Sequence, residues 1–425
     1  MKISSFNIQG FYWGLFGVIL YRILLDLNYV VIISNIYTYQ GFGNDVTVLS
    51  YLISWIILLI PVRFILNQYS SKYILFANVI TLLYLMAFVP GTSIMAFMPM
   101  KPTFSILWTT YWYLIFIFSY SLKPFKPLVL SEKLKNILLY TILAIFILTI
   151  IYVSWKYTAF RIHRSLSDIN DIRLEAREWN VPTILSYLLA AAGNILPLLF
   201  VYFLFQKKKK LAIITAIIII LNFSIEGQKV IMFNLFICLL GYWLYNEKRI
   251  TLFSWGLSLV SFSALLQYLL AGKYNILDVI VRRVLYVPVF LNYHYYNFFS
   301  THNFDYFRQS FLRHFGFASP YQTPIPRLIG KIYYNDPTNN ANNGLFSDAY
   351  LNLGTVGVLV FPFVLVILFK VMDAASRAVN VKLLIFPVVI TVFILISGTL
   401  TSGLLTNGIL LLFVCLLALP KKYNS

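Results

Sequence analysis

Residues 136–154 read NILLYTILAIFILTIIYVS, 19 positions in a row without a charged side chain. A helix needs about 20 predominantly apolar residues to cross the hydrocarbon core of a bilayer. Similar runs recur along almost the whole chain, so we predict an all-α integral membrane protein with about 12 transmembrane helices in a single polytopic domain, residues 1–425. The predicted spans are 11–33, 46–66, 73–90, 103–121, 136–154, 182–205, 211–225, 230–245, 250–270, 348–370, 383–398 and 403–419.

The composition agrees with this prediction. Of the 425 residues, 60% are hydrophobic and 11% are charged, whereas an ordinary soluble domain has about 25% charged residues. The formal net charge of +19 comes from basic residues scattered between the apolar runs, so it indicates no soluble basic face and no nucleic-acid partner. The two cysteines lie inside apolar runs and indicate no disulfide or thiolate metal site.

The basic residues also predict the topology. If the N-terminus is cytoplasmic, 18 of the 33 basic residues fall in cytoplasmic segments and 14 outside, which satisfies the positive-inside rule and places both termini in the cytoplasm. Nine arginines fall outside but only three inside. Because guanidinium binds phosphate and carboxylate groups through a planar fork of donors, the external arginines suggest an anionic ligand on that side.

All nine external arginines lie in two larger loops, 155–181 and 271–347. In the first loop, Arg161 and Arg173 belong to arginine pairs at helical spacing with acidic residues between them, which predicts an amphipathic helix near the membrane surface. The alternative is that these residues form solvated, salt-bridged faces that only stabilise the loop.

In the second loop, residues 277–299 combine Arg282 and Arg283 with many aromatic residues around Pro288, which predicts an interfacial or re-entrant helix. Tyrosines favour membrane interfaces for their own amphipathic character, so interfacial anchoring is the simpler interpretation of each ring. Arg313 follows, and then a Pro-rich and Asn-rich stretch that we predict to be a loop rather than a span.

The long loop ends with NGLFSDAYLNLGTVGV at residues 343–358. Its Asp348, Tyr350, Gly354 and Gly357 resemble the end of the large external loop in the Wzy-type polymerases of O-antigen and capsule repeat units. The resemblance extends weakly over most of the chain. It implies a fold like that of the polyprenyl-phosphate-using (GT-C-like) glycosyltransferases and a place in the bacterial inner membrane.

The resemblance also implies an activity. The growing glycan on undecaprenyl diphosphate would be transferred at the periplasmic face to a hydroxyl of the next lipid-linked oligosaccharide repeat unit. The partners would be these lipid-linked oligosaccharides, the lipid bilayer and a polysaccharide chain-length regulator. The closely related alternatives are an O-antigen ligase and a flippase for the same lipid-linked units.

This activity requires cationic groups for the diphosphate and a base for the attacking hydroxyl. We predict Arg282 and Arg283 as the main diphosphate ligands. The further candidates from other loops are Lys229, Arg313, Arg161 and Arg173. Lys229 aligns with a position where the family usually has Arg, so the bidentate geometry of guanidinium is lost there.

Asp348 is the first candidate for the base, with His314 and Glu226 as rivals. The structural alternatives are that Asp348 is the N-cap of the following span and that Glu226 pairs with Lys229. The chain has no Asp-x-Asp pair and its four histidines are far apart in sequence, so we predict neither a metal nor another cofactor. Arg22 and Asp26, four residues apart in the first span, are predicted to form an ion pair.

Overall fold

A computed structural model describes residues 8–66, 73–161, 175–176, 178–244 and 252–419, and within these ranges the chain is helical without strands. Eight of the described helices are long and apolar enough to cross a membrane, which supports a multi-pass α-helical membrane protein. They are Gly10–Ile36, Val48–Leu66, Ile74–Phe97, Glu132–Thr158, Thr183–Phe205, Leu252–Ala271, Phe346–Ser376 and Leu400–Ala418.

The four remaining predicted spans are helical as well. They correspond to α7 (Pro102–Ser121), α11 (Lys209–Glu226), α12 (Lys229–Leu244) and α17 (Ile385–Ser397). None of the four is among the eight helices that meet the length and apolarity of a span, so the figure of 12 spans stays a prediction.

Several long helices contain a π-helical segment. In the first span, α1 (Ile8–Asn28) continues through η1 (Tyr29–Ile33) into α2 (Ser34–Ile36). In the third span, η4 (Tyr84–Phe88) joins α5 (Ile74–Leu83) to α6 (Val89–Phe97). A third segment, η5 (Ser154–Thr158), ends α8 (Glu132–Val153). Such segments widen the helix locally and occur frequently at functional sites.

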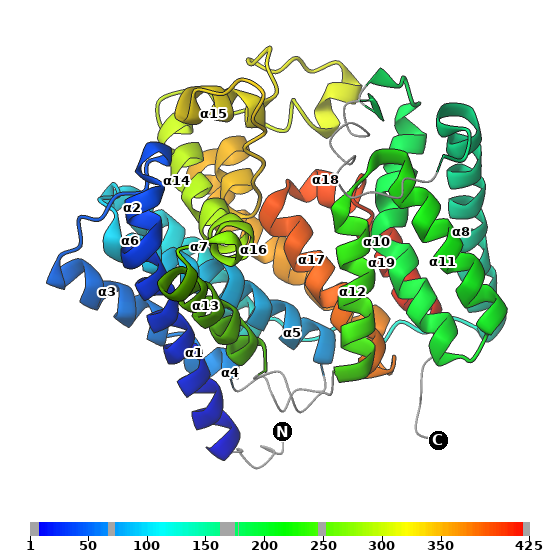
Figure 1. The fold of residues 1–425 in the computed structure, drawn as a ribbon, viewed down its shortest axis with the longest axis horizontal. Helices are drawn as coiled ribbons and strands as arrows, with labels where there is room; N and C mark the ends of the chain where they lie inside the picture. The colour runs from blue at the N-terminus through cyan, green and yellow to red at the C-terminus, as the bar shows by residue number, and fades with distance from the viewer. Residues whose placement is uncertain (1–7, 67–72, 162–174, 177, 245–251, 420–425) are drawn as a thin grey trace.

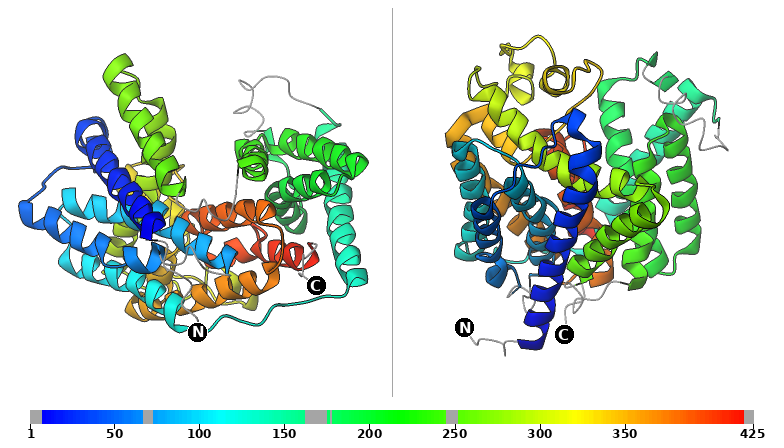
Figure 2. Two further views of the ribbon diagram at one scale, coloured as in Figure 1. Left: turned by 90° about the horizontal axis from the view of Figure 1, so that it is seen from below. Right: turned by 60° about the vertical axis from the view of Figure 1, so that its left-hand side comes forward.

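The helices form two groups joined by a central layer (Figures 1 and 2). One group contains α1, α3 (Val48–Leu59), α6, α7 and α13 (Leu252–Ala271). The other contains α8, α10 (Thr183–Phe205), α11 and α12. Between them, α5, α16 (Phe346–Ser376), α17 and α19 (Ile409–Ala418) pack against one another and against both groups.

Close helix packing depends on a glycine at the centre of the first group. The third span, Ile74–Phe97, is the most buried of the eight, because 94% of the residues in its apolar stretch are buried. A Cβ atom at Gly91 would lie 2.2 Å from the Trp108 ring of α7, so only glycine lets the two helices approach this closely. The same Trp108 ring stacks on Phe88 with 5.4 Å between ring centroids.

The predicted long loop 271–347 is mostly helical. Its elements are η7 (Leu277–Tyr286), α14 (Val287–Phe299), η8 (Phe311–Phe315) and α15 (Ile325–Tyr334), and they lie at the upper side of Figure 1, opposite the start of α1. Pro288 stands in the first turn of α14, where its missing N–H costs no helical hydrogen bond. Most of α14 is buried against α16, so this helix is part of the protein core rather than an interfacial anchor.

Part of the predicted first loop, 155–181, is a continuation of α8 through η5 to Thr158. Arg161 follows this helix and pairs with Glu175 at 2.5 Å, with both side chains nearly half exposed. Arg173 and most of the predicted amphipathic helix lie outside the described residues.

Candidate functional site

The side chain of Arg282 is held by three neighbours from two distant parts of the chain. Its Nε and Nη2 atoms lie 2.8 Å and 2.6 Å from Oδ1 of Asp278, one helical turn earlier in η7. Its Nη1 atom donates to the Gln40 side chain at 2.8 Å, and its guanidinium lies over the Tyr37 ring, 4.4 Å from the centroid. The segment that follows the first span therefore fixes the orientation of Arg282.

Asp278 completes this arrangement, because it also accepts a hydrogen bond from the Tyr37 hydroxyl at 2.8 Å. Burial alone would raise the pKa of the Asp278 carboxyl, but the hydrogen bonds from Tyr37 and Arg282 outweigh that effect and lower it. Asp278 therefore stays a carboxylate at neutral pH.

Arg283, the next residue, has a different environment. Its side chain is exposed, and it forms no hydrogen bond or ion pair with any residue that the structure describes. A free guanidinium beside one that is fixed in place leaves a strong donor available to an anionic ligand.

The helix that carries both arginines is anchored at its other end inside the first helix group. Tyr286, the last residue of η7, donates from its hydroxyl to the Leu25 carbonyl at 3.0 Å and lies 2.9 Å from the Ser93 hydroxyl. Ser93 in turn donates to Asp26 at 2.6 Å. A chain of hydrogen bonds thus joins η7 to α1 and α6.

The predicted ion pair in the first span is confirmed, with Arg22 Nε 2.7 Å from Asp26 Oδ1 and both residues buried. Arg22 also donates to the hydroxyls of Thr92 at 2.9 Å and Ser54 at 3.0 Å, and Tyr51 donates to Asp26 at 3.2 Å. Every neighbour in this set comes from α3 or α6. The pair is therefore satisfied by three helices, as a charge at membrane depth requires.

Rings from two π-helical segments pack together next to this ion pair. Tyr29 of η1 lies 5.4 Å from Tyr286 of η7, measured between ring centroids. Because a π-helical turn shifts the register of the residues after it, these segments set the rotation of the helices around the ion pair. The helix that carries Arg282 and Arg283 is therefore held in place by a polar network within the bundle.

His294 of α14 forms a second notable group. Its ring is only 7% exposed, and neither nitrogen has a hydrogen-bond partner among the residues that the structure describes. The ring stacks on Tyr333 with 4.2 Å between ring centroids. Its centroid lies 4.3 Å from that of Phe290 and 5.6 Å from that of Tyr334. Burial lowers the pKa of His294 from 6.5 to about 3, so the ring is neutral at physiological pH.

Asp348 is buried, and both of its carboxylate oxygens accept hydrogen bonds from the protein. Its side chain is 2% exposed, and Oδ2 accepts the backbone N–H of Leu400 at 2.6 Å while Oδ1 accepts from Asn352 at 2.9 Å. The N-cap of α16 is Leu345, three residues earlier, so the structural alternative in which Asp348 is the N-cap is wrong. The carboxylate instead binds the first residue of α18 (Leu400–Leu404).

A series of hydrogen bonds continues from α18 into the second helix group. The Asn407 N–H donates to the Ser402 carbonyl at 2.8 Å, and the Asn407 carbonyl accepts from the Asn194 side chain at 3.0 Å. Asn234 donates to Asn194 at 3.0 Å. Asp348 thus belongs to a polar connection between α16 and helices α10 and α12.

The remaining predicted residues lie apart from these two groups. The Glu226 side chain is half-buried and accepts a hydrogen bond from Gln228. Lys229 is exposed and forms no ion pair with Glu226, so the structural alternative for Glu226 is wrong. Arg313 is exposed in η8. His314 belongs to the same short helix, and its side chain lies outside the described residues.

Arg282 and Arg283 are therefore neighbours on η7, whereas the Asp348 carboxylate binds Leu400 and Asn352 and neither arginine. Tyr37, Gln40 and His294 were missed by the sequence analysis. Tyr37 and Gln40 follow the first span in what reads as a plain connecting segment, and nothing in their spacing indicates a contact with residues about 240 positions later.

No family model, curated protein or solved structure matches this chain.

Proposed function

We propose that the protein polymerises undecaprenyl-diphosphate-linked oligosaccharide repeat units at the periplasmic face of the bacterial inner membrane. The observation that carries the proposal is the pair on η7, in which a fixed Arg282 stands next to an exposed Arg283 that forms no hydrogen bond or ion pair with the described residues. The resemblance of residues 343–358 to the Wzy-type polymerases supplies the reaction.

In this reaction the bond between the anomeric carbon of the growing glycan and its diphosphate breaks. A hydroxyl oxygen of the incoming unit forms the new glycosidic bond, its proton passes to a base, and undecaprenyl diphosphate leaves. Negative charge builds up on the departing diphosphate, so guanidinium groups stabilise the transition state more than the ground state. Arg283 would make this contact, and Arg282 would set the local geometry.

The base in this proposal is one of the three predicted residues. Asp348 has both carboxylate oxygens occupied by Leu400 and Asn352, which favours a structural role. Glu226 is half-buried at the end of α11, with Gln228 as its one hydrogen-bond partner among the described residues. The Glu226 carboxylate therefore has more free hydrogen-bonding capacity than that of Asp348, but α11 belongs to the second helix group, whereas η7 contacts α6 and α13 of the first.

The test is electrophoretic profiling of surface polysaccharide from a deletion strain complemented with wild type, Arg283→Ala or Glu226→Gln. We expect wild type to restore a ladder of many repeat units, and both variants to shorten it toward a single unit on the acceptor. Loss of one charge-assisted contact corresponds to about 1.5–3 kcal/mol, or roughly a 10- to 150-fold lower rate.

Lys331→Ala is the matched control, because Lys331 is an exposed basic residue on α15 at the same side of the molecule. It should keep the full ladder at the same protein level by immunoblot. If the deletion removes every repeat unit from the acceptor, the proposed polymerase is wrong and a ligase or flippase replaces it. If Arg283→Ala and Lys331→Ala behave alike, η7 does not bind the diphosphate.

A further inference from the structure

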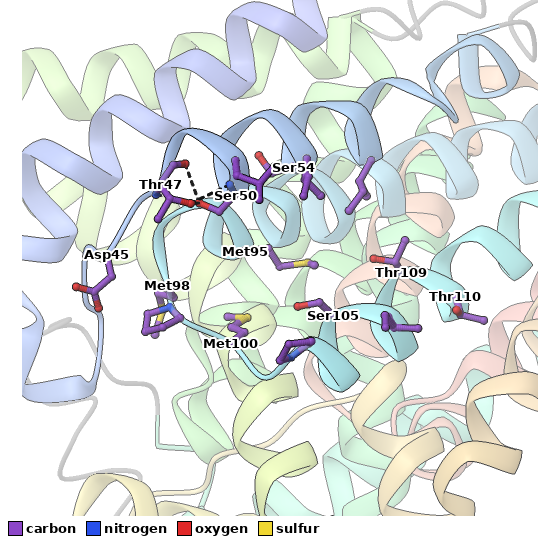
Figure 3. A pocket seen from close by; sticks show the side chains of 16 residues that line it. Asp45, Thr47, Ser50, Ser54, Met95, Met98, Met100, Ser105, Thr109 and Thr110 are labelled. Carbon is purple, nitrogen blue, oxygen red and sulfur yellow. Dashed lines mark hydrogen bonds between the residues drawn. The ribbon is translucent and has the colours of Figure 1, made fainter.

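A cavity of about 670 Å³ lies between α3, the end of α6 and the start of α7, and the proposed polymerase does not use it (Figure 3). Its wall is mainly apolar and includes Met95, Met98 and Met100, whose unbranched thioether chains adapt to flexible ligands. The volume corresponds to roughly twenty groups of the size of a water molecule, and a methylene is of similar size. One hydrocarbon chain therefore fits the cavity.

The cavity opens on the outer surface of the helix group. Leu49, Ile53 and Ile106 line it, yet their side chains are 68%, 45% and 65% exposed. They continue into an apolar surface on α3. In the span that contains α3, Val48–Leu66, only 28% of the residues in the apolar stretch are buried. In a bilayer this surface faces lipid, so a lipid chain can enter from the side without crossing water.

One charged residue, Asp45, lines the cavity, and a residue of opposite charge, Lys101, lies next to its wall in sequence. Asp45 lines it, and the Asp45 backbone N–H donates to the Phe97 carbonyl at 2.8 Å, which joins the segment before α3 to the end of α6. Lys101 lies between the lining residues Met100 and Pro102. Both charged side chains are exposed, and they form no ion pair with each other.

We propose that this cavity binds one chain of a zwitterionic, amine-bearing phospholipid, with its ammonium group at Asp45 and its phosphate at Lys101. Lipid tails are as apolar as the cavity wall, so burial of the chain within a bilayer supplies little selectivity. The headgroup contacts must then decide which lipid is retained. Asp45 repels an anionic headgroup and above all a diphosphate, which disfavours the polyprenyl substrate as the occupant.

The proposal is tested by native mass spectrometry of the purified full-length protein released from vesicles. The vesicles contain phosphatidylethanolamine and phosphatidylglycerol with identical palmitoyl-oleoyl chains in equal amounts. We expect wild type to retain one phosphatidylethanolamine at least about 5-fold more often than phosphatidylglycerol. Asp45→Asn should reduce this ratio to near one, and Thr110→Phe, which narrows the cavity, should reduce retention of both lipids.

Asp336→Asn and Leu148→Phe are the controls, because the first makes the same change as Asp45→Asn and the second introduces the same ring as Thr110→Phe, each at a residue that does not line the cavity. Both should retain phosphatidylethanolamine like wild type. Equal retention of the two lipids by wild type, or an unchanged ratio in Asp45→Asn, would overturn the proposal. Displacement of phosphatidylethanolamine by an equal amount of undecaprenyl diphosphate would also overturn it and would assign the cavity to the substrate. None of these lipid-binding results affects the ladder test of polymerase activity, because that test changes other residues.

Discussion

The Asp348 carboxylate accepts the backbone N–H of Leu400 at 2.6 Å, across 52 positions of sequence. This contact ties the start of α16 to the short helix α18 at the junction of the two helix groups (Figure 1). Asn352 occupies the other carboxylate oxygen. An acidic residue at the end of the long segment between α13 and α16 therefore has a clear structural role.

Asp348→Asn should destabilise the protein more than it affects the chemistry. The amide keeps the size of the carboxylate but places one N–H₂ group against a donor, either Leu400 or Asn352. A buried hydrogen bond left unmade costs about 1–3 kcal/mol, so we expect a lower melting temperature of the purified protein in detergent. If the variant melts like wild type but yields a single repeat unit in vivo, Asp348 is the catalytic base after all.

The Arg22–Asp26 pair gives a prediction about compensation. Removing one partner with Arg22→Met or Asp26→Leu should cost about 3–5 kcal/mol, because the other charge stays buried without its partner. The double variant should recover most of that loss. Thermal unfolding of the four proteins checks this expectation.

The control for this cycle is Arg161→Ala, which removes an ion pair whose side chains are nearly half exposed. This change should cost no more than about 1 kcal/mol. A double variant as unstable as the sum of both single variants would show that the hydroxyl partners, rather than the two charges, determine the stability of this region.

The contrast between these two contacts shows what the sequence predicts and what it does not. Arg22 and Asp26 are four residues apart in an apolar run, so helical geometry and the cost of a lone charge were enough to predict their pairing. Asp348 and Leu400, or Arg282 and Gln40, meet only because distant helices pack together. No local period encodes such contacts.

The difference between local and long-range information also explains which features of the helices were predicted correctly. Apolar length is a local property, so the predicted spans correspond to helical segments in the described part of the chain, although 403–419 is divided between α18 and α19. The burial of residues 287–299 depends on how α14 packs against α16, and its aromatic residues look the same in sequence whether they face lipid headgroups or a protein core. The sequence therefore predicted an interfacial or re-entrant helix without indicating its packing against α16.

Gly354 should be intolerant of a side chain. It breaks α16 with φ of 55° and ψ of −136°, and a Cβ atom there would lie 2.5 Å from the Phe304 ring. Gly354→Ala should lower stability by about 1–3 kcal/mol. Gly256→Ala in α13 is the control, because nothing lies within 4 Å of its Cβ position and alanine favours a helix. Equal melting temperatures for the two variants would mean that α16 tolerates a continuous helix.

His294 should make stability depend on pH in mildly acidic conditions. Its pKa is lowered from 6.5 to about 3, so between these pH values the imidazole is protonated in the unfolded chain and neutral in the folded protein. The contribution of the neutral ring is complete above pH 6.5 and is lost as the pH falls from 6.5 toward 3, at up to about 1.4 kcal/mol per pH unit. Thermal unfolding at pH 7.5 and pH 5 measures the effect.

His294→Phe should remove this dependence without loss of packing. The phenyl ring has a similar shape, stacks on Tyr333 in the same way and carries no unpaired nitrogen atoms. We expect a melting temperature at pH 7.5 equal to or above that of wild type, and a smaller drop at pH 5. His302→Phe, at an exposed histidine, should keep the wild-type drop. If His302→Phe flattens the pH dependence and His294→Phe does not, the neutral buried ring is not its source.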